Sequence, residues 1–348
     1  MKSMKRAATL GLMFFIAAAS AACGDKPAQA PPHDVPPLDS SANTAGTGTA
    51  STAATAAPSA EMQKGVAAIK SKDFAEAKTV FLGIVQKEPS NAEAQFYLGV
   101  ALENTKDKKG ALAAYEAAVK NKRDFDDALA NLSALYIDEA RFDDAVRVLE
   151  AAEPEKRKNG GLALNLAVAY AGKDDRAKAK TAFEAAKRLA PRDPMVLLTQ
   201  GQWLGKWKDP AAPAVLKSAA DAAPDDVGVL ASAGFELKNV GAFADCTSVL
   251  DRAIGLKDVA ELRTYRALCK LGLKDKKGAL DDLLAATKNE PKYAPAHFYL
   301  GGRYADDKAW KKAADAYDMY LKLDADGPLA APAKARAKLA RDKAAGKK

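Results

Sequence analysis

Apolar side chains recur at helical spacing through most of the chain, in runs that short polar turns interrupt. The stretch 94–122 shows the plan: an apolar run, the polar turn NTKDKKG, and a second apolar run of similar length. A spacing near 3.6 residues is typical of helices that bury one face. The pattern therefore predicts a helix, a tight turn and a second helix.

Two short words of sequence occur twice within this pattern. QFYLG at 95–99 returns as HFYLG at 297–301, and DKKGAL at 107–112 returns at 275–280. Aligning the chain on these words gives a period of 34 residues, which slips by one residue in the fifth and sixth units. About eight units in phase cover residues 58–327. Self-similarity of this kind is typical of stacked helix hairpins, so we expect an all-α repeat fold.

The unit resembles the tetratricopeptide repeat, whose pattern W-x2-L-G-x2-Y…A-x3-F…P is present here in degraded form. Matching residues in the first, second, third, fourth and eighth units are Gly65, Ala77, Phe81 and Pro89; Leu98, Gly99, Ala111 and Tyr115; Leu132, Tyr136, Ala145 and Leu149; Leu166, Ala167, Tyr170, Ala179, Phe183 and Pro191; and Leu300, Gly301, Tyr304, Ala313 and Tyr317. The fifth to seventh units match less well, and the first helix around Ala267 can be placed only to within one or two residues. The resemblance implies a right-handed superhelical solenoid with a concave inner surface.

The first 22 residues have the layout of a signal peptide. A basic start, MKSMKR, precedes an apolar run that is too short to span a bilayer, and small residues follow. Cys23 lies where a bacterial lipobox, which this stretch resembles, places the cysteine that receives acyl chains such as palmitate. Ser20 replaces the usual Leu, and ordinary cleavage after Ala22 is the alternative. Gly24 in place of a retaining aspartate implies, by the same resemblance, an outer-membrane lipoprotein facing the periplasm; the alternative is a soluble periplasmic protein.

Residues 23–57 have no apolar periodicity and are rich in Pro, Ala and Thr. Such a segment cannot bury enough surface to offset its ordering entropy, so we expect a disordered tether.

The formal charge of +8 is concentrated at the two ends of the chain. The first six residues contribute +3 and residues 328–348 contribute +6, so subtracting both from +8 leaves −1 for the body. A neutral body in an exported chain argues against nucleic acid as a partner. Two interpretations of the basic 328–348 segment stay open: a polar helix that caps the repeats, or a contact with anionic lipid or lipopolysaccharide.

Motifs for catalysis are missing from the sequence. It has no Gly-rich phosphate loop, no nucleophile elbow and no His-Glu metal motif, and its only histidines are His33 and His297. We therefore expect no enzyme activity, no cofactor, no metal and no small-molecule substrate. Three Asp-Asp pairs, 126–127, 143–144 and 281–282, are expected at helix starts, where carboxylates favour the positive end of the helix dipole. Trp203 and Trp207, four residues apart on one helix face, are expected in the core; an exposed pair that grips a partner is the alternative.

Two cysteines, Cys246 and Cys269, fall on neighbouring predicted helices. They are expected on the second helix of the sixth unit and on the first helix of the seventh. An exported protein meets an oxidising compartment, so a disulfide is possible. Two buried thiols acting as small apolar residues are the alternative.

The resemblance also implies where a partner would bind. In this family the residue just before the Leu-Gly pair of each first helix faces the concave surface. That series is Gln63, Tyr97, Asn131, Asn165, Thr199, Ser232, Tyr265 and Tyr299. Asn131 and Asn165 suit the alternating N–H and C=O groups of a peptide, and Phe96, Leu164 and Phe298 flank the series. Solvated asparagine is the plainer interpretation.

These observations favour one function class over another. The first is a protein–protein interaction scaffold anchored at the cell envelope. By resemblance to tetratricopeptide lipoproteins, it would help assemble a pilus, a secretion or polysaccharide-export system, or outer-membrane proteins. The alternative is a periplasmic enzyme or accessory subunit with an unrecognised site. Fold-level analogy does not identify the partner.

Overall fold

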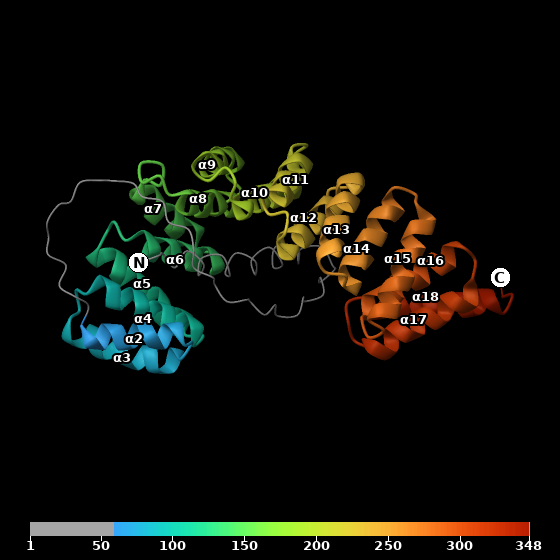
Figure 1. Cartoon of the computed structure of the whole chain (residues 1–348), viewed down its shortest axis with the longest axis horizontal. Helices are drawn as coiled ribbons and strands as arrows, with labels where there is room; N and C mark the ends of the chain where they lie inside the picture. The colour runs from blue at the N-terminus through green and yellow to red at the C-terminus, as the bar shows by residue number, and fades with distance from the viewer. Residues whose placement is uncertain (1–58, 348) are drawn as a thin grey trace. The chain divides into compact units, whose positions relative to one another are not determined.

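A computed structural model of the chain describes residues 59–347 (Figure 1). Every regular element in that range is an α-helix, and no strand occurs there. The all-α prediction is therefore confirmed for the described residues. The predicted signal peptide, the lipidation site Cys23 and the tether 23–57 lie outside them. The described helices fall into two compact units divided between Glu139 and Ala140, called unit 1 and unit 2 below.

Unit 1 consists of five helices in which each packs on the next one along the chain. They are α2 (Ala60–Lys70), α3 (Phe74–Lys87), α4 (Ala92–Asn104), α5 (Lys108–Asn121) and α6 (Asp126–Asp138). The helix hairpins α2–α3 and α4–α5 correspond to the first and second predicted repeats.

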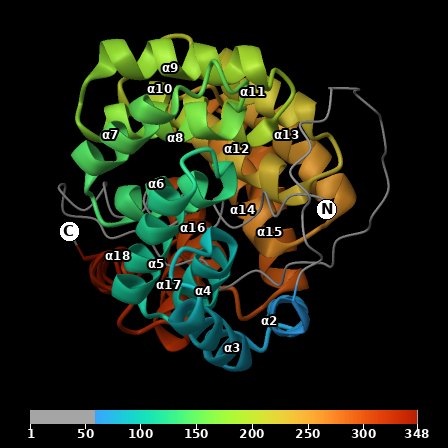
Figure 2. The ribbon, with the colours of Figure 1, turned by 90° about the vertical axis from the view of Figure 1, so that its left-hand side faces the viewer.

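Unit 2 consists of twelve helices. They are α7 (Phe142–Ala152), α8 (Gly160–Gly172), α9 (Arg176–Leu189), α10 (Pro194–Lys206), α11 (Ala212–Ala222), α12 (Val227–Asn239), α13 (Phe243–Leu256), α14 (Ala260–Gly272), α15 (Lys276–Asn289), α16 (Ala294–Asp306), α17 (Trp310–Leu323) and α18 (Ala330–Ala344). The hairpins α8–α9 to α16–α17 pack in sequence, and Figures 1 and 2 show α9 beside α8. The first helices α8, α10, α12, α14 and α16 also contact one another in chain order, so they form one row.

The unit boundary falls inside the third predicted repeat. That repeat combines Leu132 and Tyr136 with Ala145 and Leu149, and the structure assigns the first two to α6 of unit 1 and the last two to α7 of unit 2. Within its own unit, α6 packs on α5, and α7 packs on α8.

The turn inside each hairpin has the same backbone conformation. A residue with positive φ occurs once per turn: Lys72, Lys106, Ala140, Asp174, Lys208, Gly241, Lys274 and Lys308. These residues are 34 apart, except that the steps to Gly241 and to Lys274 are 33. The shortened steps locate the slip in the period after the fifth and after the sixth turn. Only Gly241 has the residue type that adopts this conformation without a Cβ penalty, so composition alone did not reveal the turns.

The doubled word DKKGAL encodes the start of a second helix. Asp107 caps α5 by accepting a hydrogen bond from the backbone N–H of Gly110 at 2.9 Å, and Asp275 does the same for Gly278 at the start of α15. An aspartate at this position satisfies one of the unpaired N–H groups of the first turn. The word recurs because the same helix start is needed in both hairpins.

The doubled word FYLG encodes a close approach between paired helices. A Cβ atom added to Gly99 of α4 would lie 2.5 Å from Cε1 of Tyr115 in α5. One added to Gly301 of α16 would lie 2.9 Å from the Tyr317 ring in α17. Both rings are buried. Glycine is required there because the ring of the second helix fills the space that a side chain would take.

Helix α18 lies within the region 328–348 that the sequence predicted as a C-terminal helix. Its small residues Ala330, Ala333, Ala337 and Ala340 are buried in one cluster with Tyr317 and Tyr320 of α17. Most of its charged side chains are exposed. The helix therefore covers the apolar surface that α17 would otherwise present to solvent.

Candidate functional site

The series predicted to face a partner starts in unit 1 with Gln63, Tyr97 and Asn131. Gln63 is exposed, and Tyr97 is half-buried with its ring stacked on Phe81 at 5.2 Å between centroids. Asn131 of α6 is only 6% exposed. Its Nδ2 donates a hydrogen bond to the Tyr115 hydroxyl at 3.2 Å.

A small polar group surrounds this buried amide. The Tyr115 hydroxyl in turn donates to Oε2 of Glu103 at 2.8 Å. Burial is the main cause that raises the pKa of both Glu103 and Tyr115, and the hydrogen bond to Tyr115 partly opposes the shift at Glu103. Asn131 thus ends a chain of hydrogen bonds that joins α4, α5 and α6. The bond to Tyr115 uses one of the amide N–H groups that Asn131 could otherwise offer to a ligand.

The series continues in unit 2 with a change in exposure. Asn165, 4% exposed, and Thr199 are buried, whereas Ser232, Tyr265 and Tyr299 are partly exposed. Within unit 2, the accessible members therefore lie on α12, α14 and α16.

The three residues predicted to flank the series pack inside their own units. Phe96 contacts the Tyr115 and Phe125 rings, at 6.0 and 5.0 Å between centroids. Leu164 is buried on α8. Phe298 lies edge-on to Tyr317 and Tyr320, and the Arg336 guanidinium is 4.9 Å from its ring centroid.

A second group of residues on the row of first helices was missed by sequence reasoning. Phe235 of α12 lies 5.3 Å from Tyr265 of α14, and the Lys238 ammonium lies 4.6 Å from the Phe235 centroid. Among residues 59–347, no carboxylate oxygen lies within 4.0 Å of that ammonium. Burial lowers the pKa of Lys238. The available signal was Phe235 and Lys238 one helical turn apart, directly after Gly234.

Hydrogen-bond acceptors lie beside this aromatic pair. Glu236 accepts from Nε2 of Gln202 in α10 at 3.4 Å, and burial raises its pKa. Glu261 accepts from the Tyr265 hydroxyl at 3.1 Å. The face formed by α10, α12 and α14 thus combines aromatic surface, an ammonium donor and carboxylate acceptors, which are the groups that a peptide chain can use.

The prediction that Trp203 and Trp207 are core residues is wrong. Both are only partly buried, with ring centroids 5.7 Å apart. A Lys206 ammonium lies 4.4 Å from the Trp203 ring, and the Arg176 guanidinium lies 5.9 Å from the Trp207 ring. Trp207 follows the last residue of α10, so the end of the helix, rather than its buried stripe, sets its environment.

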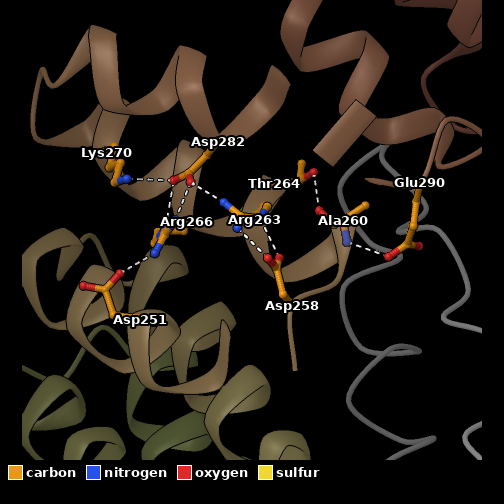
Figure 3. Close-up of polar contacts among 9 residues, drawn as sticks. All are labelled: Asp251, Asp258, Ala260, Arg263, Thr264, Arg266, Lys270, Asp282 and Glu290. Atoms are coloured by element: carbon orange, nitrogen blue, oxygen red, sulfur yellow. Dashed lines mark hydrogen bonds and ion pairs between the residues drawn. The ribbon is translucent and has the colours of Figure 1, made fainter. Parts of the chain in front are cut away.

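One of the three Asp-Asp predictions is also wrong. Asp126–Asp127 and Asp143–Asp144 lie in the first turns of α6 and α7, as expected. Asp282 instead lies in the second turn of α15, is 2% exposed, and faces three cations of α14. Figure 3 shows Arg263, Arg266 and Lys270 directed at its carboxylate. Helix α14 carries these cations on a partly buried face that packs against α15, and the sequence of α15 alone does not show this.

This cluster is balanced in charge. Nε of Arg266 donates to Oδ2 of Asp282 at 2.8 Å and Nη1 donates to Asp251 of α13 at 2.6 Å, while Arg263 pairs with Asp258. Burial by itself would raise the pKa of Asp282, but the hydrogen bonds from Arg266 and Lys270 hold it below the usual value. The paired charges join α13, α14 and α15, and they have the character of a structural cluster.

Cys246 of α13 and Cys269 of α14 are joined in a disulfide with their Cα atoms 6.2 Å apart. Both residues are fully buried. Of the two alternatives that the sequence left open, this structure has the bonded one.

Other candidate chemistry can be located in the described part of the chain. His297 is half-buried, with Nε2 2.9 Å from the carbonyl oxygen of Pro291. Within residues 59–347, no group of three or more His, Cys, Asp or Glu side chains is placed to hold a metal ion. None of the described helices has the length and hydropathy needed to cross a membrane.

Comparison with known proteins identifies the repeat. Models of the tetratricopeptide repeat family match residues 62–124, 161–193 and 264–328, so these stretches contain tetratricopeptide repeats. No curated protein matches the chain.

Solved structures share the fold at low sequence identity. The crystal structure of yeast Tom70 has a TM-score of 0.50 and 15% identity, over 78% of this chain and 59% of that chain. This chain therefore spans less than two thirds of the length of Tom70. A tetratricopeptide repeat protein from Parabacteroides merdae has a TM-score of 0.48 and 16% identity, over 66% of this chain and 91% of that one. The predicted fold class, all-α and built of tetratricopeptide helix hairpins, is confirmed.

Proposed function

We propose that this chain is a protein-binding scaffold of the bacterial cell envelope, which holds extended or helical segments of envelope proteins on the face formed by its first helices. The observation that supports it is the row α8, α10, α12, α14 and α16, along which polar and aromatic side chains recur once per repeat. Aromatic residues with hydrogen-bonding tips are enriched where proteins bind proteins.

The part of this face with the most varied accessible side chains lies on α10, α12 and α14. Phe235 and Tyr265 offer aromatic area, Lys238 offers a donor, and Glu236 and Glu261 offer acceptors. Asn131 and Asn165 are more buried, so a partner would reach them only at the edges of their amides. In this proposal each asparagine orients the side chains around it in its own unit as well as contacting a bound segment.

The proposed place of action is the periplasmic side of the outer membrane, with lipid-modified Cys23 as the anchor. The sequence before Cys23 and the Pro-rich segment after it support this assignment. Cys23→Ala should release the protein into the soluble periplasmic fraction. A wild-type protein that is already soluble, or an amino terminus that carries no acyl chain by mass spectrometry, would favour cleavage after Ala22 instead.

The binding face is tested by recovering partners from crosslinked intact cells. We expect Phe235→Ala combined with Lys238→Ala to reduce recovery strongly, and Asn131→Ala combined with Asn165→Ala to reduce it as well. Leu284→Ala is a matched control, because Leu284 is an exposed apolar residue on the second helix α15. Helical content is measured first for every variant.

The Asn131 substitution needs its own control. Tyr115→Phe removes the same hydrogen bond while leaving the Asn131 amide in place. If Tyr115→Phe lowers recovery as much as the asparagine variants do, the effect is structural. Unchanged recovery with both pairs of variants, with the fold intact, would refute this face as the binding site.

The assembly that the scaffold serves is proposed only as a class: a pilus, a secretion or export system, or outer-membrane protein assembly. Identifying the crosslinked proteins by mass spectrometry distinguishes these systems. If no protein partner is recovered and the purified protein converts a small molecule, the alternative of a periplasmic enzyme is favoured.

A further inference from the structure

The C-terminal end of unit 2 has a surface that the proposed binding face does not use. A shallow pocket of about 300 Å³ lies between the last three helices. Its lining includes Gly302 and Ala305 of α16, Trp310 and Tyr317 of α17, and Arg336 and Leu339 of α18. We call it the C-terminal pocket.

Leu339 projects from the rim of this pocket into solvent. Its side chain is 55% exposed, more than any other exposed large apolar residue among residues 59–347. The buried stripe of α18 is made by alanines, so the packing of the helix on α17 does not require Leu339. Trp310, also in the lining, is only partly buried. Leu339 and Trp310 thus form a small apolar patch on a charged surface.

Cations without carboxylate partners lie on the same helices, α17 and α18, as this apolar patch. Arg336 is held in the lining by the Phe298 ring, at 4.9 Å, and by the Tyr317 hydroxyl. Lys311 follows Trp310 directly, and Lys343 lies one helical turn beyond Leu339. Among residues 59–347, neither lysine has a carboxylate oxygen within 4.0 Å.

Two acidic groups near the pocket have cationic partners. Asp306 is in the lining of the pocket, with Oδ2 3.9 Å from Arg303, and Asp318 of α17 pairs with Arg341 at 2.7 Å. Asp315, one helical turn from Lys311, is exposed. Residues 328–348 carry a net charge of +6, so the positive charge that could attract a polyanion comes mainly from this C-terminal segment.

We propose that the C-terminal pocket contacts the surface of an anionic phospholipid bilayer. Lys311, Arg336 and Lys343 meet the lipid phosphates, while Leu339 and Trp310 enter the boundary between headgroups and acyl chains. A projecting leucine with a tryptophan and several cations has the composition of a membrane-surface contact. An acidic protein is the other class of partner, but it would be expected to fill the pocket rather than to require an apolar side chain that projects from it.

The test uses the full chain carrying Cys23→Ala, so that no acyl chain contributes to binding. Co-sedimentation is measured at low salt with vesicles of phosphatidylcholine alone and with vesicles that contain equal parts of phosphatidylglycerol. We expect binding only to the second kind, and loss of binding at high salt. Lys311→Gln combined with Lys343→Gln should weaken binding about tenfold or more, because lysines close to an anionic membrane surface are attracted to it.

Matched variants separate this contact from general charge and hydrophobicity. Leu339→Ser should weaken binding severalfold, whereas Leu284→Ser, which removes another exposed leucine of unit 2, should not. Lys277→Gln combined with Lys288→Gln removes two exposed lysines of α15 and serves as the charge control. Circular dichroism checks that each variant is folded.

Three results would overturn the proposal: no binding to phosphatidylglycerol vesicles, equal binding to both kinds of vesicle, or equal effects of the test and control variants. Binding to soluble polyglutamate that depends on Lys311 and Lys343 but not on Leu339 would assign the surface to an acidic protein instead. None of these outcomes bears on the binding face of α10, α12 and α14, whose test is the recovery of crosslinked partners.

Discussion

The hairpins α4–α5 of unit 1 and α14–α15 of unit 2 contain the same word, DKKGAL, yet they have different interiors. Both second helices begin with an aspartate cap, at Asp107 and at Asp275. The two hairpins can be aligned on that word. Buried residues of α4–α5 then correspond to charged residues of α14–α15: Gln95, Leu98, Leu102 and Ala114 align with Arg263, Arg266, Lys270 and Asp282.

At these positions the α4–α5 hairpin has mostly apolar side chains, whereas the α14–α15 hairpin adds paired charges to its apolar core of Ala267, Ala279 and Leu283. Leu98 and Leu102 are buried beside Tyr115 and Gly99. Their counterparts Arg266 and Lys270 instead surround the buried carboxylate of Asp282. Ala101 of α4 corresponds to Cys269 of α14, which is bonded to α13. One backbone plan thus accepts either kind of interior, provided that the turn and the caps are kept.

The largest expected difference concerns Asp282. Asp282→Asn should lower the free energy of unfolding by about 3–5 kcal/mol, because Lys270 loses its carboxylate partner while Arg263 and Arg266 each lose one of two carboxylates. Urea unfolding followed by circular dichroism measures the change. Asp281→Asn, one residue away and exposed, should change it by less than about 0.5 kcal/mol.

A rescue sharpens that experiment. Replacing Arg263, Arg266, Lys270 and Asp282 together by Gln, Leu, Leu and Ala gives α14–α15 the residues that α4–α5 has at these four positions. Apolar replacement of a whole buried ion cluster is often neutral or stabilising, so most of the lost stability should return. A combined variant as unstable as Asp282→Asn would contradict the equivalence of the two interiors.

The next largest effect concerns the disulfide. Cys246→Ala with Cys269→Ala should lower the free energy of unfolding by about 3 kcal/mol, since the bond closes a loop with a sequence separation of 23 residues. Thiol counting on the denatured, non-reduced protein should find neither cysteine free. Two reactive thiols at these positions would mean that the seventh hairpin is held to α13 without a covalent bond.

A smaller effect on stability is expected in the α4–α5 hairpin. Tyr115→Phe should cost about 1–2 kcal/mol, because it removes the acceptor of a buried Asn131 amide and the donor to Glu103. Its counterpart in the seventh hairpin is Leu283, which has no hydroxyl. Tyr97→Phe, on a half-buried ring, is the control and should be close to neutral.

The smallest effect, in opposite directions, is expected from pH. Burial raises the pKa of Glu103 above its ordinary 4.5, so its contribution to stability grows as pH falls from neutral toward 4.5. At Asp282 the paired cations outweigh burial and lower the pKa below 3.8, so its contribution is present above 3.8 and is lost as pH falls further. Urea midpoints across this range should lose the first trend in Glu103→Gln and the second in Asp282→Asn.

The fold was predictable because the repeat is written in local terms. Helical spacing, the caps of α5 and α15 and the Gly–aromatic pairs are all visible along the chain. The seventh repeat was the hardest to place, since Arg266 stands where the repeat pattern has Leu and Lys270 stands where it has Tyr. The residues of the proposed binding face were less predictable, because Phe235 and Lys238 form an accessible aromatic group only together with Tyr265 on the next first helix.

By itself the sequence determined that this chain forms α-helix hairpins with a period of 34 residues, because each turn, cap and apolar stripe depends on neighbours within a few positions. Tertiary structure alone decided which charges are buried, which aromatic rings stay accessible and that Cys246 meets Cys269. Those properties depend on which faces of two helices pack together. The pattern of apolar residues along one helix shows which of its faces is buried, but it does not show which residues of the neighbouring helix pack against that face.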